Sequence, residues 1–400
     1  MKIAEDSSDL QFLKLEPAQE NKTRPLEIPE NISEDLTEWD YQSYRRITTI
    51  DLTEIQQERI RVPKKTYSRQ DTVVAMHWHP EFIPMELIRE RVNTMFPNKS
   101  RELIIPTNHN ILNCYDGKHT GVEVDCFAKP FNRKVQILLH FENSKVEKAD
   151  VLKSMLKHTL RYRSSQLFEL IHSIVDPNLD HRLQEAGKLY GADEDLLRFV
   201  KVYTRKLEKL LLEHESVTPQ DHIKNKLLAN YFDQLLEFYD ERLIKRAQFL
   251  IQKVKKIVKK HFSPDYFYSI EEFIEETRML GGGIVIPHPE QFWPILLAEY
   301  DVDGIEVWNP QSQEFTEFLI NVVNQKNKTH LRGQRPILIF MGDDCHLSEK
   351  IKEPQCQNRE KVSREVGYQP AWDDLAIRKS LIVANTDRGK LIEEYVARLN

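Results

Sequence analysis

Two histidines follow a short apolar run and have the spacing of paired metal ligands. His77 and His79 lie in Met76-His77-Trp78-His79-Pro80, directly after the run Thr72–Ala75. Alternate residues of a strand point to the same face, so the two imidazoles would lie side by side at the strand's end. Imidazole nitrogens are common ligands of divalent transition metals. The spacing therefore predicts half of a metal site, whose other ligands must come from elsewhere in the chain.

Further histidines and carboxylates occur where other short apolar runs end. They are His109, Glu123, His288, Asp344 and His346. In barrel-like sheets the carboxyl ends of several strands converge on one face, which would bring such side chains together. This set is sufficient for two or three divalent ions, and zinc, manganese and iron all accept mixed nitrogen and oxygen ligands. Ions bridged by carboxylates lie about 3.5–4 Å apart, the spacing that clamps the attacking and leaving oxygens of a displacement reaction.

The elements that would position these ligands are short strands separated by helices. Apolar runs of strand length occupy residues 72–76, 103–106, 122–128, 135–141, 284–287, 305–308 and 336–341. Helix start signals lie between them, such as Pro84 in a first turn and the capping box Ser269-Ile270-Glu271-Glu272, whose helix is expected to stop at Gly281. This alternation predicts an α/β fold with β/α units around a largely parallel sheet.

Residues 150–262 break this alternation. They contain two glycines and two prolines, and their apolar spacing predicts long helices over 198–212 and 228–258. The block carries 21 Lys and Arg against 16 Asp and Glu. One face of its last helix is basic and consists of Arg242, Arg246, Lys253, Lys256 and Lys260. We therefore expect an all-helical insertion within the α/β domain.

The chain is accordingly divided into five predicted segments. They are an N-terminal extension (1–70), the first part of a barrel (71–149), the helical insertion (150–262), the second part of the barrel (263–350) and a C-terminal helix and tail (351–400). The extension shows no sustained periodicity over its first 40 residues, and the tail carries no recognisable chemistry.

Composition restricts the class of protein. The 400 residues are 40% hydrophobic and 30% charged, which fits a globular protein, and the net charge of −6 argues against a general nucleic-acid binder. The four cysteines show no C-x-x-C spacing, so neither a zinc knuckle nor a disulfide framework is indicated. The first residues do not read as a secretory signal, and no stretch approaches the ~18 apolar residues of a membrane span. A cytoplasmic location without membrane contact is expected.

The ligand pattern resembles the PHP (polymerase and histidinol phosphatase) superfamily of metal-dependent phosphoesterases. Six segments in the family's order are similar to its motifs: His77-Trp78-His79 (H-x-H), Thr107-Asn108-His109-Asn110 (T-D-H-N), Gly121-Val122-Glu123-Val124 (G-x-E-[IV]), 282–289 (G-G-x-x-x-x-H-P), 304–310 (G-I-E-V-[YF]-N) and 342–346 (G-S-D-x-H). Each motif alone is weakly specific, whereas six in order form a specific pattern. The resemblance covers residues 71–145 and 265–350, less than half of the chain.

This resemblance implies a distorted (β/α)7-type PHP barrel, interrupted here by the helical insertion, with a multinuclear metal centre. The implied ligands are His77, His79, Glu123, His288, Asp344 and His346, with His109 either a ligand or a contact to the phosphate. The chain lacks the family's S-D-G acidic ligand, for which Glu81 is the best substitute. Asn108 replaces the usual Asp and Gln136 stands where many members have a His, which favours two metals over three. Asp344 and His109 are the expected catalytic residues.

The implied activity is hydrolysis of a phosphate ester of a small phosphorylated metabolite or nucleotide by a metal-activated water. A first alternative is a nuclease that holds a polynucleotide on the basic helical insertion, although nucleic acid is the less favoured substrate. A second is a non-catalytic module with a structural metal whose insertion binds a partner. A third is hydrolysis of a C–N or C–O bond by the same kind of centre. The sequence leaves the substrate, the metal and the oligomeric state open.

Overall fold

The computed structural model describes residues 28–329 and 335–400. Within these residues the chain forms two compact units, one of residues 52–157 and 267–400 and the other of residues 28–51 and 158–266. The five segments predicted from the sequence have other boundaries, since the predicted helical insertion covers 150–262 and the second unit contains 158–266. Of the predicted N-terminal extension, residues 1–27 lie outside the described part of the chain, and the remainder is shared between the two units.

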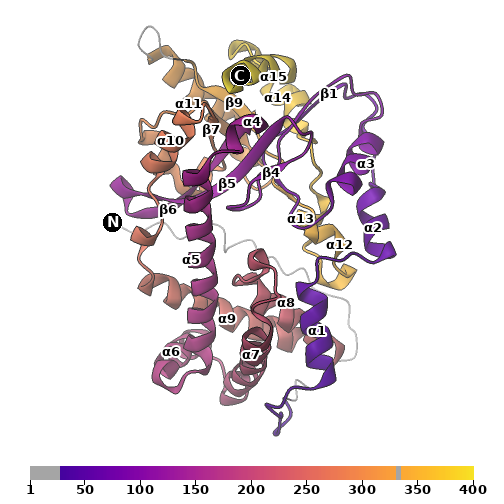
Figure 1. The fold of residues 1–400 in the computed structure, drawn as a ribbon, viewed down its shortest axis with the longest axis vertical. Helices are drawn as coiled ribbons and strands as arrows, with labels where there is room; N and C mark the ends of the chain where they lie inside the picture. The colour runs from indigo at the N-terminus through magenta and orange to yellow at the C-terminus, as the bar shows by residue number, and fades with distance from the viewer. Residues whose placement is uncertain (1–27, 330–334) are drawn as a thin grey trace. The chain divides into compact units, whose positions relative to one another are not determined.

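The first unit alternates strands and helices (Figure 1). Its strands are β1 (Thr72–Ala75), β2 (Trp78–His79), β3 (Arg101–Ile104), β4 (Asn113–Cys114), β5 (His119–Ala128), β6 (Arg133–Glu142), β7 (Gly283–Ile286), β8 (Gly304–Trp308), β9 (Leu338–Met341) and β10 (Cys345–His346). Its helices are α2 (Glu54–Arg61), α3 (Met85–Met95), α4 (Asn143–Val146), α10 (Ile270–Met279), α11 (Thr316–Thr329), α12 (Ser348–Ile351), α13 (Arg359–Ser363), α14 (Leu375–Val383) and α15 (Arg388–Leu399).

These strands form three ladders. β1 pairs with β3 and β2 pairs with β10, both in parallel, and the largest sheet has the order β4-β5-β6-β7-β8-β9. In that sheet the β7–β8 and β8–β9 pairs are parallel, whereas the β4–β5, β5–β6 and β6–β7 pairs are antiparallel. The fold is therefore α/β with a mixed sheet, and the prediction of a largely parallel sheet is wrong for its β4–β7 half. The strands of the described residues do not form one continuous closed sheet.

The antiparallel half follows from a short connection. β5 and β6 are ten-residue strands joined by the turn 129–132, in which Asn132 has a φ of 48°. A connection of four residues can join only antiparallel neighbours, because a parallel crossover needs a dozen residues or more. Asparagine tolerates the left-handed conformation that such a turn requires.

Two backbone junctions connect the ladders. His109, on the continuation of β3, forms a parallel bridge with Glu123 in β5. The β2–β10 ladder sets His79 opposite His346. Candidate ligands from separate parts of the sequence therefore lie at the points where the ladders meet.

Helices cover the strands of the first unit. α10 begins with the predicted capping box of Ser269 and Glu272 and ends before Gly281, which has a φ of 67°, so both predicted helix boundaries are confirmed. α15 contacts β1, β3, β6, β7 and β9. Its Tyr395 is fully buried, packs against Phe340 and hydrogen-bonds His140. α15 therefore packs against these strands through buried side chains.

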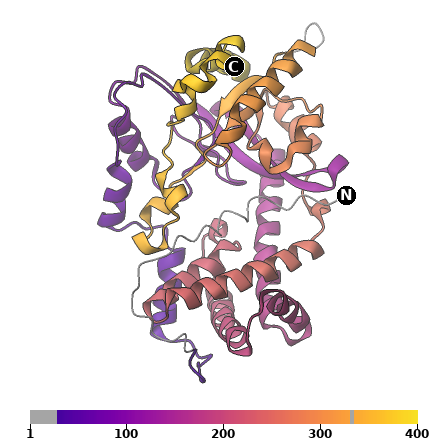
Figure 2. The same ribbon diagram turned by 180° about the vertical axis from the view of Figure 1, so that it is seen from behind.

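The second unit is helical and contains α1 (Glu38–Thr48), α6 (Asp180–Tyr190), α7 (Glu194–His214), α8 (Lys226–Gln234) and α9 (Glu241–His261), while α5 (Asp150–Val175) enters it from the first unit. α9 contacts α6, α7 and α8 (Figure 2). The single helix predicted over 228–258 is wrong, because it is divided into α8 and α9. Asp240 caps α9 by accepting a hydrogen bond from the Arg242 N–H. In the described residues, no helix combines the length and the apolar character needed to cross a bilayer.

Candidate metal centre

The two histidines of the H-x-H segment lie at the C-terminal end of the first strand. His77 follows β1 and His79 ends β2, while Trp78 between them is fully buried in an apolar cluster. The ring of His79 stacks on that of His346, with ring centroids 4.2 Å apart. The centroid of the His77 ring lies 5.5 Å from that of His79. The structure therefore brings the predicted pair together and adds His346 from β10.

Glu123 lies at the centre of the cluster. Its side chain is 1% exposed in the middle of β5. Oε1 lies 3.3 Å from Nε2 of His288 and 3.8 Å from Nε2 of His77. Oε2 lies 2.5 Å from Nδ1 of His109 and 3.7 Å from Nε2 of His79. One buried carboxylate thus faces four imidazoles, two on each oxygen, which is the arrangement expected of a bridging ligand.

Asp344 supplies a second buried carboxylate. Its Oδ1 lies 3.4 Å from Nε2 of both His79 and His346, and 3.8 Å from Nε2 of His77. The residue has a φ of 43°, in the left-handed region, and its N–H donates to the His77 carbonyl oxygen at 2.8 Å. Non-glycine residues in this region are rare and cluster at functional sites, where the surrounding structure holds them.

Glu81 lies at the edge of the cluster. Its Oε1 is 3.6 Å from Nδ1 of His346, and its Oε2 accepts a hydrogen bond from the Ser348 N–H at 2.8 Å. The Asn108 amide accepts from the Glu81 N–H at 2.8 Å and donates to the Glu81 carbonyl at 3.0 Å. An aspartate could only accept, so asparagine at 108 suits the backbone of Glu81, which has a φ of 55°.

These donors can hold metal ions. Two groups have one ligand atom from each member within 4.8 Å of the others: His79 with His109 and His346, and His77 with His79 and Glu123. Nε2 of His77 and both ring nitrogens of His79 are buried without a hydrogen-bond partner among the described residues. Leaving buried polar atoms unpaired costs about 1–3 kcal/mol each, which a coordinated cation would remove. The residues present therefore fit a divalent metal.

Glu306 belongs to the centre although the sequence did not single it out. Its Oε2 accepts a hydrogen bond from Nδ1 of His77 at 2.8 Å, and its Oε1 accepts one from the Asn309 amide at 2.9 Å. A carboxylate on the far nitrogen of an imidazole fixes the tautomer and directs the other nitrogen to a metal. A methyl group at Gly342 would overlap the Glu306 carboxylate, so this position requires glycine. The motif containing Glu306 was recognised, but its contact with His77 depends on the placement of β8.

The protonation states fit this arrangement. Burial lowers the pKa of His77, but Glu306, helped by Asp344 and Glu123, reverses the effect and raises it to about 10. Burial and the neighbouring imidazoles of His346 and His109 lower the pKa of His79 well below its ordinary value. Burial acts to raise the pKa of Glu123 and Asp344, yet the adjacent histidines outweigh it and keep both well below the usual range. Both carboxylates are therefore ionised, and His79 offers a neutral imidazole.

The remaining candidates differ in accessibility. The side chain of His109 is 26% exposed, more than that of any other predicted ligand, and Gln136 lies 3.4 Å from its Nδ1. His140 is fully buried, and its two nitrogens contact the Tyr395 hydroxyl at 2.8 Å and the Met76 carbonyl at 3.0 Å. His140 is thus a structural histidine, whereas His109 lies where a substrate can reach it.

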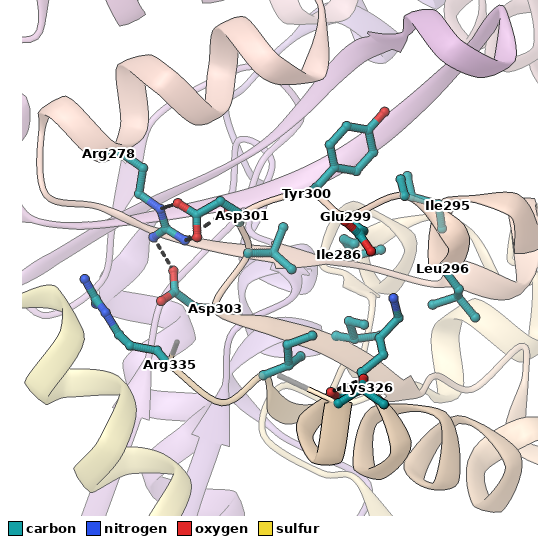
Figure 3. Close-up of a pocket in the computed structure, with 15 residues that line it drawn as sticks. Arg278, Ile286, Ile295, Leu296, Glu299, Tyr300, Asp301, Asp303, Lys326 and Arg335 are labelled. Atoms are coloured by element: carbon teal, nitrogen blue, oxygen red, sulfur yellow. Dashed lines mark hydrogen bonds and ion pairs between the residues drawn. The ribbon is translucent and has the colours of Figure 1, made fainter. Parts of the chain in front are cut away.

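A cavity of about 530 Å³ lies on another side of the first unit (Figure 3). Arg278 points across its edge to Asp301 and Asp303, with contacts of 2.7 and 2.5 Å. Ile305 of β8 lines this cavity, whereas its neighbour Glu306 faces His77. Neighbouring residues of a strand point to opposite faces. The cavity is therefore separated from the metal donors by β8 and contains none of them.

Comparisons with known proteins include a distant structural likeness. No family model and no curated protein matches the chain. A solved structure from Bifidobacterium adolescentis, named a "putative metal-dependent phosphoesterase", has a TM-score of 0.38 and 13% sequence identity, with 80% of this chain and 96% of that chain covered. A similarity this low establishes neither a shared fold nor a shared activity.

Proposed function

We propose that this chain is a metal-dependent phosphoesterase of the PHP type. The observation that carries the proposal is the convergence of imidazoles from separate strand ends on the buried carboxylate Glu123, with ring nitrogens of His77 and His79 left unpaired. A structural histidine cluster would pair these nitrogens with protein groups. The order of the six motifs supports the same assignment.

We also infer that the three ladders are sections of the distorted seven-stranded barrel. The segments follow one another around a ring in the order 72–79, 101–110, β5, β6, β7, β8 and 338–346. The bridge between His109 and Glu123 joins the continuation of β3 to β5, and the β2–β10 ladder pairs the segments that follow β1 and β9, so both support this order.

The proposed metal ligands are His77, His79, Glu81, His109, Glu123, His288, Asp344 and His346. Two ions fit best, since Glu123 presents one oxygen to His77 and His288 and the other to His79 and His109. Mixed nitrogen and oxygen donors suit zinc, manganese or iron. A bound ion of this kind supplies Lewis acidity toward a phosphoryl oxygen and lowers the pKa of water.

Side chains of this protein position the metal ligands and the substrate. Glu306 fixes the tautomer of His77, so that Nε2 faces the centre. The carboxylates of Glu123 and Asp344 remain ionised, because the adjacent histidines keep their pKa values well below the usual range. His109, at the accessible edge, is positioned to contact the phosphate of a substrate. We propose a small phosphorylated metabolite or nucleotide as that substrate.

Hydrolysis of p-nitrophenyl phosphate and bis-p-nitrophenyl phosphate tests the proposal. Purified protein reconstituted with manganese or zinc should hydrolyse at least one of them, lose activity with a chelator and recover it with the metal. The double variant His77→Ala, His79→Ala should be inactive, whereas Asp301→Asn, at the separate cavity, should retain activity. Preference for the monoester supports a phosphatase, and preference for the diester a phosphodiesterase. Metal-loaded protein without turnover on either ester would contradict the proposed reaction.

A further inference from the structure

A buried arginine from the C-terminal part of the chain holds Asp344. Arg364 donates from Nη1 to Oδ2 of Asp344 at 2.6 Å and to its carbonyl oxygen at 3.1 Å. Its side chain is 2% exposed. The amide of Gln311 donates to the same Oδ2 at 2.8 Å. Neither Arg364 nor Gln311 belongs to the six motifs.

These contacts give the two carboxylate oxygens of Asp344 different partners. Oδ2 of Asp344 is taken by Arg364 and Gln311, whereas Oδ1 faces the Nε2 atoms of His79 and His346 at 3.4 Å. A carboxylate held in this way has one oxygen left for coordination. Hydrogen bonds to the non-coordinating oxygen also fix the plane of the carboxylate.

Arg364 is itself fixed by its surroundings. Its Nη2 donates to Glu360 at 2.7 Å, and its carbonyl oxygen accepts from Lys350 Nζ at 2.6 Å and from Cys345 Sγ at 3.2 Å. The planar guanidinium can therefore reach Asp344 in one orientation, which a flexible ammonium group would not maintain.

We propose that Arg364 is a positioning residue of the metal centre, which restricts Asp344 to coordination through Oδ1. The proposal rests on the proposed function only in requiring a cation at the centre. The predicted C-terminal segment, for which the sequence indicated no chemistry, thereby contributes to the site. Removal of Arg364 leaves Oδ2 of Asp344 with the neutral donor Gln311, so the carboxylate can turn, the centre loses affinity and Oδ2 becomes available as a second ligand atom.

Cobalt(II) titration of the full-length protein tests this proposal. Affinity is measured by competition with a chelator, and the visible absorption spectrum reports the coordination number. Arg364→Met should weaken cobalt binding about 10- to 100-fold, the usual effect of losing an outer-shell partner, and shift the spectrum toward higher coordination. Arg364→Lys should recover part of the affinity. Asp301→Asn, at the separate cavity, is the control and should leave affinity and spectrum unchanged.

The outcomes separate this inference from the proposed function. Cobalt binding and a spectrum that are unchanged in Arg364→Met would overturn the role of Arg364. Wild-type protein that binds no cobalt would overturn the metal centre itself. If Arg364→Met does not fold, Arg364→Lys decides, because it keeps the buried positive charge but replaces the planar guanidinium that holds Oδ2. A weaker affinity with a changed spectrum supports the restriction of Asp344, and an unchanged titration refutes it.

Discussion

Replacing Glu306 by glutamine should change the number of protons released when metal binds. In the metal-free protein burial lowers the pKa of His77, but Glu306, together with Asp344 and Glu123, raises it from its ordinary value of 6.5 to about 10. His77 is then almost fully protonated at neutral pH and must lose the proton on Nε2 to become a ligand. Without the carboxylate at 306, the largest influence that opposes burial is removed, so the pKa of His77 falls and a smaller fraction of the imidazole is protonated.

The size of the effect follows from these values. At pH 7.5 a group with a pKa of about 10 is more than ~99% protonated, so His77 of the wild type releases about one proton when metal binds. Wild-type protein should therefore release more protons per metal centre than Glu306→Gln, by at most about one. The raised pKa also stabilises the metal-free fold, fully so below pH 6.5, and this contribution is lost as the pH rises through about 10.

Calorimetric titration with manganese, in buffers of different ionisation enthalpy, measures the proton count directly. Asp116→Asn is a suitable control, since it removes a carboxylate paired with His119, which is not one of the metal donors. Glu306→Gln should bind manganese about 10- to 100-fold more weakly, which stays measurable. Equal proton release from the wild type and Glu306→Gln would refute the coupling between Glu306 and His77.

Three further substitutions test separate parts of the structure. Gly342→Ala should displace the Glu306 carboxylate and destabilise the fold by about 1–3 kcal/mol in urea unfolding. It should also release fewer protons on metal binding, as Glu306→Gln does. Proton release equal to that of the wild type would contradict the overlap between a side chain at 342 and Glu306. Burial lowers the pKa of His140 to about 3, so the unfolded chain binds the proton more readily and stability falls as the pH drops from about 6.5 toward 3. Between pH 7 and 5, the free energy of unfolding of the metal-free protein in urea should therefore fall by about 2 kcal/mol less in His140→Gln than in the wild type. An identical pH dependence of the two proteins would count against a buried neutral imidazole. Asp40→Ala leaves Lys206 buried without its partner at 2.9 Å and should destabilise the second unit by about 3–5 kcal/mol in thermal unfolding, where a loss below 1 kcal/mol would contradict the pairing.

The period of two in a strand was sufficient to predict that His77 and His79 share a face. The same reasoning predicted the other donors at strand ends. The structure instead places Glu123 in the middle of β5, and it brings His77, His79, His109 and His288 together around this carboxylate. Local spacing specifies such features because they depend on the geometry of one strand and on where it ends.

Other features depend on contacts that no local pattern contains. The hydrogen bond of Glu306 to His77 spans 229 positions, and Arg364 reaches Asp344 from another segment. The antiparallel pairing of β5 with β6 did have a local signal, the short connection 129–132, which was outweighed by the β/α alternation elsewhere. The division between α8 and α9 was also indicated locally by Asp240, a good N-cap residue within a continuous apolar pattern.

Elemental analysis of the purified protein, beside the variant His77→Ala, His79→Ala, tests the central claim most directly. The account predicts about two transition-metal ions per wild-type chain after reconstitution and dialysis, and their loss in the variant. Circular dichroism of both proteins shows whether the variant remains folded. A wild-type chain that retains no metal, or a folded variant that retains the full complement, would contradict a metal centre built on these two histidines.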